Sequence, residues 1–173
     1  SIGIPFPDTE ARIVDVQTGE EELPVGEEGE LVLRGPQVMK GYLNMPDETV
    51  RALRDGWLYT GDIATMDEDG FFYIVDRKQD RIIAHGHTVW PTKVEEVLLQ
   101  HPAVEEAVVV GVADLTRCAT DLRALVVLNR SRGVTRSEEL LKFCKERLEA
   151  FQVPEAIEIV DELPKTPLGK VSR

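Results

Sequence analysis

The apolar residues change their spacing once along this chain, close to position 76. Before that point, in residues 11–16 and 29–35, apolar and polar side chains alternate, and turn sequences separate the runs. After it, apolar residues recur at helical spacing, first between Pro91 and Pro102. Alternation predicts strands, and the longer period predicts amphipathic helices. We therefore expect an α+β protein, in which a small antiparallel β-barrel-like subdomain precedes a compact α+β carboxy-terminal domain.

The second half predicts the order helix, strand, strand, helix, strand. Pro91 suits the first turn of the first helix, and Pro102 ends it. The predicted strands are residues 104–112, 122–128 and 156–160. Thr135 and Glu138 have the spacing of a capping box, so the second helix is expected to begin there and to continue to Pro154.

Turn residues organise the first half. A short helix is predicted over residues 48–53, after a polar stretch. The runs 57–59 and 71–75 are predicted to pair as a hairpin, with Asp69 and Gly70 as its turn.

Charge divides the chain at the same place. The 173 residues carry 32 acidic and 20 basic side chains, a formal net charge of -12, and the whole excess lies before residue 77. Nucleic acids and anionic membranes need a basic surface, so neither is an expected partner. No apolar run reaches the roughly 20 residues of a membrane span, although peripheral membrane contact is compatible with the sequence. Two cysteines and no signal peptide favour the cytoplasm.

Three short sequences contain residue types that suit phosphorylated ligands. Asp62 follows a glycine after an apolar run, where its carboxylate could accept hydrogen bonds from ribose hydroxyls or could simply be solvated in a turn. Asp76 and Arg77 begin a charged run that suits a linker or a hinge. Lys170 follows a proline-containing segment, where it is either a point charge for an anion or a plain terminal lysine.

Metal binding and nucleophilic catalysis have no candidate by spacing. His85 and His87 lack nearby cysteines or acids that would complete a ligand set, so no metal site of protein ligands is expected. Cys118 and Cys144 have no neighbouring base. Cys144 sits in a helical pattern where a small buried hydrophobic residue would fit.

The three sequences occur in the order, and at about the separations, of the carboxy-terminal motifs of adenylate-forming enzymes. They read Trp-Leu-Tyr-Thr-Gly-Asp at 57–62, Ile-Val-Asp-Arg at 74–77 and Pro-Lys-Thr-Pro-Leu-Gly-Lys at 164–170, and residues 35–42 and 101–104 also match. The chain resembles the carboxy-terminal portion of that superfamily over essentially its whole length. Among the members it is most similar to the long-chain fatty acid–CoA ligases.

The resemblance implies a two-step reaction that uses ATP, Mg²⁺ and CoA. A carboxylate attacks ATP to give acyl-AMP and pyrophosphate, and the CoA thiol then displaces AMP. By motif position, Asp62 would hold the ribose hydroxyls and Arg77 would contact the nucleotide. Lys170 would be the catalytic residue of the first step, bridging the carboxylate and the phosphate.

The resemblance also implies a division of the chain. Residues 1–76 would be the last β-rich subdomain of a large adenylating domain, residues 77–80 a hinge, and residues 81–173 a mobile carboxy-terminal domain. Gln79 would be the pivot, where family members usually carry lysine or aspartate. Gly86 would let the pantetheine of CoA pass close to the backbone in the second step.

The family's ATP-phosphate loop and its adenine-binding segment do not occur in these residues. We therefore expect a carboxy-terminal fragment of a longer ligase, inactive alone. Its partners would be a carboxylic acid, ATP, CoA and the remainder of its own large domain. Two alternatives stay open: an enzyme that loads an acyl or aryl group onto a carrier protein, and a non-catalytic module that binds a partner through an acidic face.

Overall fold

The structure is a computed structural model, and it describes residues 1–114, 119–129 and 135–165. By its internal contacts the chain divides into a first unit, Ser1–Gln79, and a second unit, Asp80–Arg173. Each unit has a buried apolar cluster of its own. Among the described residues, no helix combines the length and the apolar character that crossing a membrane requires.

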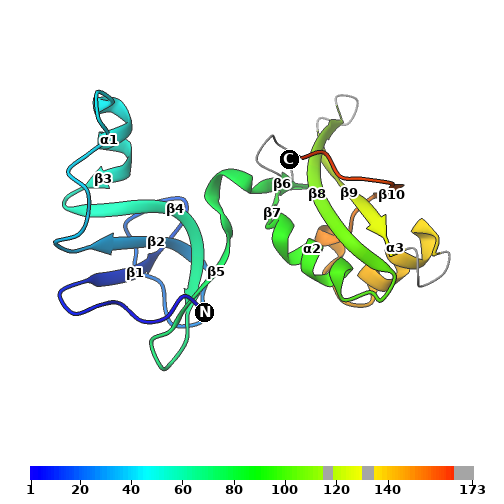
Figure 1. Cartoon of the computed structure of the whole chain (residues 1–173), viewed down its shortest axis with the longest axis horizontal. Helices are drawn as coiled ribbons and strands as arrows, with labels where there is room; N and C mark the ends of the chain where they lie inside the picture. The colour runs from blue at the N-terminus through cyan, green and yellow to red at the C-terminus, as the bar shows by residue number, and fades with distance from the viewer. Residues whose placement is uncertain (115–118, 130–134, 166–173) are drawn as a thin grey trace. The chain divides into compact units, whose positions relative to one another are not determined.

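The first unit is a curled antiparallel sheet with one short helix (Figure 1). Its sheet order is β1-β2-β4-β3, and β5 also pairs with β4. The elements are β1 Glu10–Val14, β2 Gly29–Arg34, α1 Pro46–Ala52, β3 Leu53–Arg54, β4 Trp57–Met66, β5 Phe72–Arg77 and the 3₁₀ turn η1 Lys78–Asp80. The predicted β-barrel-like subdomain is confirmed. Helix α1 begins two residues earlier than predicted because Pro46 occupies its first turn.

Alternating side chains of this sheet build its core. Ile13 of β1 pairs with Leu31 of β2, and both pack with Ala64 of β4 and Phe72. Since successive strand residues point to opposite faces, this cluster fixes which face of each strand is buried.

Strand β4 contains a bulge at the place where a turn was one of two interpretations of the sequence. Glu30 pairs with Ile63 and Val32 with Tyr59, so Leu31 of β2 faces the three residues 60–62 of β4. Gly61 supplies the bend, with a φ of +72°. The strand therefore continues past Asp62 to Met66 instead of ending before it.

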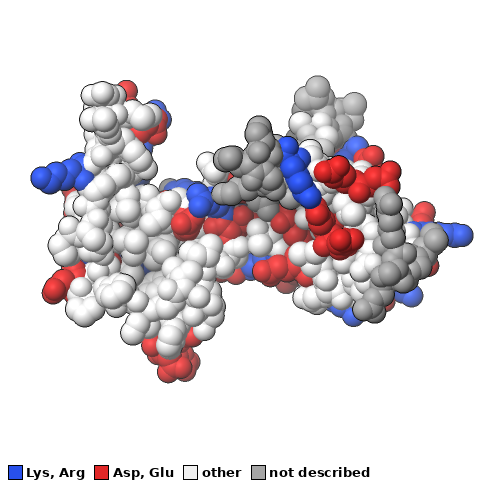
Figure 2. All heavy atoms as spheres, in the orientation of Figure 1, with Lys and Arg blue, Asp and Glu red and all other residues white. Residues whose placement is uncertain are grey.

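A hairpin forms between β4 and β5 around the predicted turn, but its first strand differs from the prediction. Residues 62–66 of β4 pair with β5, whereas residues 57–59 pair with β2 and β3. Asp67 and Gly70 close its loop, with the Gly70 N–H donating to the Asp67 carbonyl at 3.0 Å. The Asp67 carboxylate accepts from the Phe71 N–H and from the Tyr73 hydroxyl, both at 2.9 Å, and these bonds lower the pKa of Asp67. Figure 2 shows acidic side chains gathered at this tip of the first unit, where residues 67–69 lie.

The second unit packs helices on a mixed three-stranded sheet of order β10-β9-β8. Strand β8 is antiparallel to β9, and β10 is parallel to it. Helix α2 contacts β8, α3 contacts β10, and the two helices contact each other. The elements are β6 Ile82–Ala84, β7 His87–Val89, α2 Pro91–Leu99, β8 Val104–Asp114, β9 Ala119–Leu128, α3 Ser137–Lys145, η2 Ala150–Gln152 and β10 Ala156–Val160. The predicted order is confirmed, and the β6–β7 hairpin was not predicted.

One apolar cluster holds the second unit together. Helices α2 and α3 contribute Val94, Leu98, Leu140 and Cys144, all fully buried. The strand residues opposite them are Val109, Leu122, Ala124, Val126 and Ile157. Cys144 is thus the small buried hydrophobic residue that its pattern predicted.

Helix α3 differs from its prediction at both ends. Arg136 is the N-cap, and its backbone N–H donates to Glu139 at 3.5 Å, so the helix begins one residue later than Thr135 implied. It ends at Lys145, although Leu148 still packs against the core from the turn that follows. An apolar residue at helical spacing predicts a buried side chain, but it does not show whether a helix or a turn carries that side chain.

Candidate functional site

Asp62 and Arg77, which come from separate sequence motifs, lie side by side on β4 and β5. They are paired in register, and Asp62 Oδ1 is 3.2 Å from Arg77 Nε. The Asp62 side chain is 28% exposed and the Arg77 side chain 64% exposed, so both reach solvent. Together they present carboxylate acceptors and guanidinium donors, which suit a ligand that offers hydroxyls and negative charge.

The bulge holds Asp62 through hydrogen bonds of its own. The Thr60 hydroxyl donates to the Leu31 carbonyl at 2.8 Å and accepts from the Asp62 N–H at 3.1 Å. An added Cβ on Gly61 would meet no heavy atom within 4 Å. Glycine is therefore needed at 61 for its backbone conformation and not for space.

Glu30 is the residue at this place that sequence reasoning missed. It is 3% exposed, yet its Oε1 accepts the Gly61 N–H at 3.2 Å and its Oε2 lies 2.5 Å from Lys78 Nζ. A buried carboxylate is costly unless it is paired and hydrogen-bonded, and Glu30 is both. It therefore ties the bulge to the first residue of η1. The available signal was its strand parity with Val32, which is also buried.

A cavity of about 440 Å³ lies beside the bulge in the first unit. Thr60 and Gly61 line it, together with Glu30, Tyr42, Arg51 and Tyr59 among others. Asp62 is not in its lining, so the predicted ribose-binding carboxylate and this cavity are separate features.

Gly86 occupies the tip of the β6–β7 hairpin. His85 and Gly86 form the two-residue turn, with φ values of +50° and +81°, and Ala84 pairs with His87 across it. Two successive positive φ values match a type I′ turn, which favours glycine at its second position. The turn geometry alone therefore accounts for glycine at 86, whatever passes it.

The hairpin is seated firmly on the sheet of its unit. A Cβ added to Gly111 of β8 would stand 2.9 Å from the Ile82 side chain, so Ile82 packs directly on that backbone. On the other strand, His87 stacks on Phe151 with ring centroids 4.4 Å apart. The hairpin that carries Gly86 is thus held from both of its strands.

The roles of two other predicted site residues stay predictions. Gln79 is exposed in η1, and its function as a pivot stays a prediction. Lys170 lies outside the described residues. The last of those, Lys165, is held by Glu106 of β8 at 2.9 Å, and this hydrogen bond raises the pKa of Lys165.

Comparison with known proteins decides the family. Residues 1–43 match the family described as AMP-binding enzyme, and residues 93–170 match the AMP-binding enzyme C-terminal domain. The chain belongs to the AMP-binding enzyme family. As a member, it is 51% identical over 173 residues to a long-chain-fatty-acid–CoA ligase of Bacillus subtilis and 44% identical to one of Escherichia coli. It spans 30% of the length of each of these relatives.

Solved structures of AMP-binding enzymes share its fold. ATP-bound MatB from Rhodopseudomonas palustris superposes with a TM-score of 0.88 at 34% identity, covering 98% of this chain and 33% of that one. O-succinylbenzoate coenzyme A synthetase from Bacillus subtilis, in complex with AMP, gives a TM-score of 0.83 at 36% identity over 98% of this chain and 33% of that one. The predicted resemblance to the carboxy-terminal portion of adenylate-forming enzymes is confirmed.

Proposed function

We propose that this chain is the carboxy-terminal part of a cytoplasmic, ATP-dependent long-chain fatty acid–CoA ligase. The observation that carries the proposal is the 51% identity to the Bacillus subtilis ligase, which extends over all 173 residues. The full protein converts a fatty acid and ATP to acyl-AMP and pyrophosphate, and then converts acyl-AMP and CoA to acyl-CoA and AMP.

In the first step, Asp62 and Arg77 bind the nucleotide. The Asp62 carboxylate accepts hydrogen bonds from the ribose hydroxyls, and Arg77 donates to the nucleotide from the neighbouring strand. The ion pair between them supports this assignment, because each side chain restricts the rotamers of the other before a ligand arrives. Glu30 acts as a positioning residue, since its carboxylate on β2 accepts the Gly61 N–H and so holds the backbone of the bulge.

Lys170 is the proposed catalytic residue of adenylation. Negative charge increases on the phosphoryl oxygens in the transition state, and an ammonium held there stabilises it. Mg²⁺ bound to ATP would neutralise further phosphate charge, and we assign it no protein ligand among the described residues. The Lys165–Glu106 pair attaches the chain to β8 five residues before Lys170.

In the second step, the hairpin tip at Gly86 borders the path of the pantetheine. Rotation at Gln79 moves the carboxy-terminal domain from the arrangement used for adenylation to the one used for thioester formation. The packing of Ile82 on Gly111 supports this role, because it holds the hairpin in one conformation, so that the tip can enter the active site without refolding.

The relatives do not agree on the substrate acid or on the acyl acceptor. A 2-succinylbenzoate–CoA ligase of Geobacillus is 48% identical over 147 residues, and the amide bond synthetase McbA of Marinactinospora thermotolerans has a TM-score of 0.87 at 38% identity. These relatives differ in name by acid and by acceptor, although they share this fold. We favour a fatty acid and CoA because the relatives that match every residue of the chain at 44–51% identity carry that name.

The test is ATP–pyrophosphate exchange with the full-length protein over a panel of acids, from acetate to stearate and including 2-succinylbenzoate and benzoate. Exchange should be fastest with the long-chain acids, and those acids should then give a CoA thioester. Exchange that is fastest with an aromatic acid would reject the fatty acid. Transfer to a carrier-protein thiol but not to CoA would reject the acceptor, and the absence of exchange with every acid would reject adenylation.

A further inference from the structure

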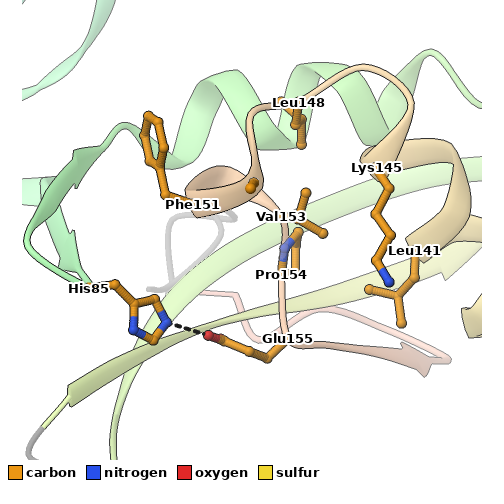
Figure 3. A pocket seen from close by; sticks show the side chains of 9 residues that line it. His85, Leu141, Lys145, Leu148, Phe151, Val153, Pro154 and Glu155 are labelled. Carbon is orange, nitrogen blue, oxygen red and sulfur yellow. Dashed lines mark hydrogen bonds and ion pairs between the residues drawn. The ribbon is translucent and has the colours of Figure 1, made fainter.

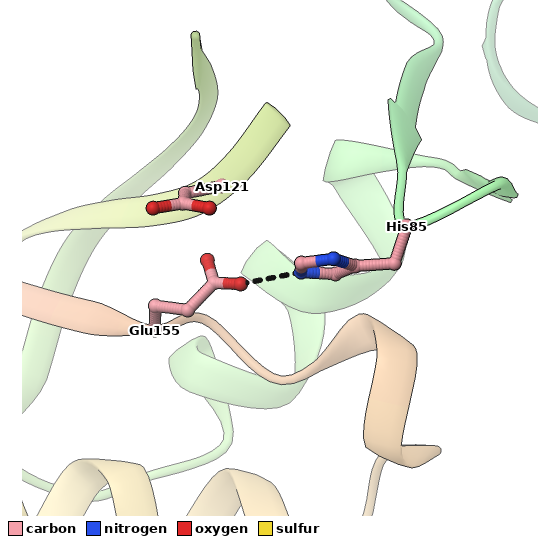
Figure 4. Close-up of side chains that lie close together, drawn as sticks. All are labelled: His85, Asp121 and Glu155. Atoms are coloured by element: carbon pink, nitrogen blue, oxygen red, sulfur yellow. Dashed lines mark hydrogen bonds and ion pairs between the residues drawn. The ribbon is translucent and has the colours of Figure 1, made fainter. Parts of the chain in front are cut away.

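Three side chains that are remote in sequence meet in the second unit. His85 comes from the tip of the β6–β7 hairpin, Asp121 from β9 and Glu155 from the residue before β10 (Figure 4). Their ligand atoms all lie within 4.8 Å of one another, and His85 Nε2 is 2.7 Å from Glu155 Oε1. Each residue therefore offers one nitrogen or oxygen ligand to a common point.

The backbone fixes all three positions. Asp121 is paired in register with Val112 of β8, so the sheet fixes its backbone. Its side chain is enclosed, since the residue is 7% exposed. The Glu155 N–H donates to the Leu122 carbonyl at 2.9 Å, which holds Glu155 beside β9. His85 occupies the type I′ turn, whose hairpin is seated through Ile82.

The cluster opens onto a cavity of about 510 Å³. His85 and Glu155 form one end of it, and Leu148, Phe151, Val153 and Lys145 are among its other walls (Figure 3). A ligand or water can therefore approach the cluster from the cavity. On the side of β9, the cluster is enclosed, because Asp121 is buried.

We propose that His85, Asp121 and Glu155 bind one divalent transition-metal ion, with Zn²⁺ as the reference ion. One imidazole and two carboxylates form a mixed nitrogen and oxygen set, which suits zinc and its neighbours better than Mg²⁺ or Ca²⁺, whose sites are built of oxygen. Three protein ligands next to a cavity leave a coordination position for water or another ligand. The proposal does not depend on the ligase function proposed above.

The geometry needs only small side-chain movements. Zinc–ligand bonds of about 2.0–2.2 Å place tetrahedral ligands roughly 3.3–3.5 Å apart. His85 and Glu155 are closer than this, and their side chains are 45% and 36% exposed, so both can rotate. Asp121 has two carboxylate oxygens, so one can bind the ion while the other can accept from a neighbouring donor.

The bound ion would join the β6–β7 hairpin to the three-stranded sheet, of which the hairpin is not a part. It would attach the turn containing Gly86 to β9 and to the chain entering β10. Binding to the folded state alone stabilises that state by mass action, so the second unit should unfold at a higher temperature when zinc is present. The separation of the ligands in sequence explains why the spacing of His85 and His87 predicted no metal site.

The test is calorimetric titration of the full-length protein with ZnCl₂, using a purification tag without histidines and protein that has been treated with a chelator. The variants are His85→Ala and Glu155→Gln, both at exposed positions. The matched controls are His87→Phe, which removes an imidazole but keeps a ring on Phe151, and Glu158→Gln on β10. Circular dichroism before titration confirms that each variant is folded.

We expect the zinc stoichiometry to fall by one in His85→Ala, or its affinity to fall by about tenfold or more, with a similar loss in Glu155→Gln. Both controls should match the unmodified protein. The visible absorption of a tetrahedral Co²⁺ site should follow the same pattern, and so should the zinc-induced rise in Tm. Equal zinc binding by His85→Ala and the unmodified protein would overturn the proposal. Equal loss in His87→Phe would overturn it as well, because it would show unspecific binding to surface histidines.

Discussion

The Glu30 carboxylate and the Lys78 ammonium form an ion pair of 2.5 Å in which the acid side chain is 4% exposed and the lysine side chain 35% exposed. The same carboxylate accepts the Gly61 N–H of the bulge. Glu30 thus connects β2, the bulge of β4 and the first residue of η1. The asymmetry in exposure means that the enclosed carboxylate depends on the pair more than the lysine does.

Removing Lys78 alone should therefore cost more than removing both charges. We expect Lys78→Met to destabilise the first unit by about 1–3 kcal/mol, because it leaves a buried carboxylate uncompensated. Adding Glu30→Gln should restore part of that loss, since a neutral amide can still accept the Gly61 N–H. Urea unfolding of the 173-residue chain checks this through Trp57 fluorescence in a Trp90→Phe background. A double variant less stable than Lys78→Met would contradict the prediction.

Loss of the Asp62 carboxylate should weaken nucleotide binding. Asp62→Ala in the full-length protein is expected to raise the KM for ATP several-fold, because the ribose hydroxyls lose their acceptor. Steady-state kinetics at saturating acid and CoA measure the change. The control is Glu68→Ala, an acid in the β4–β5 loop, which should leave the KM unchanged. An unchanged KM in Asp62→Ala would remove this residue from the site.

Lys170 should serve only one half-reaction. We expect Lys170→Ala to reduce acyl-AMP formation by a factor on the order of 100 or more, because the transition-state charge loses its cation. Thioester formation from preformed acyl-AMP should be largely retained. Pyrophosphate exchange measures the first step and single-turnover thioester formation the second. Equal losses in both steps would refute this division of labour.

Two substitutions at Gly86 separate the turn from the passage of CoA. Gly86→Ala strains a backbone with φ of +81° and should lower stability by roughly 1 kcal/mol, whereas Gly86→Asn tolerates that conformation better. Both add a side chain beside the proposed pantetheine path, so both should slow thioester formation. Thermal unfolding and the second half-reaction are measured on each. If Gly86→Asn transfers the acyl group at the unmodified rate, glycine is required by the turn alone.

The buried thiol of Cys144 should make the second unit less stable in alkali. Burial raises the pKa of Cys144 to about 11 from 9.0, so the folded state keeps its proton after the unfolded state has lost it. The contribution to stability is present below pH 9 and is lost as pH rises from about 9 to 11. Urea unfolding followed through Trp90, in a Trp57→Phe background, should show this decline. It should be smaller in Cys144→Ala, and an identical decline would contradict the assignment.

The sequence pattern was sufficient to predict the helices and strands whose residue pattern fits only one kind of element. Residues 156–160 were predicted as a strand with the observed bounds, and Pro91 began its helix as expected. The β6–β7 hairpin escaped because its strands are three residues long and His85-Gly86 is a less familiar turn pair than Asn-Gly. Short strands depend on tertiary packing, here Ile82 on Gly111, which no local pattern records.

The candidate site was predictable only in its motif residues. Asp62 and Arg77 stand in recognisable sequences, and the register of β4 and β5 makes them neighbours. Glu30 stands in a strand where an acid normally faces water, and its burial depends on a lysine 48 positions away. The cluster of His85, Asp121 and Glu155 has the same origin, since strand pairing and the packing of the β6–β7 hairpin, and not sequence spacing, bring these residues together.

The bulge in β4 also limits how the length of this segment can vary. Leu31 faces three residues instead of one, so β4 carries an even surplus of residues there. Side chains alternate between faces, and an even surplus leaves Ala64 on the buried face that it shares with Ile13 and Leu31. Insertion or deletion of one residue at 60–62 would exchange the inner and outer faces of one part of the strand. Length changes of two residues preserve that alternation, so natural variation in loop length at this place should occur in steps of two.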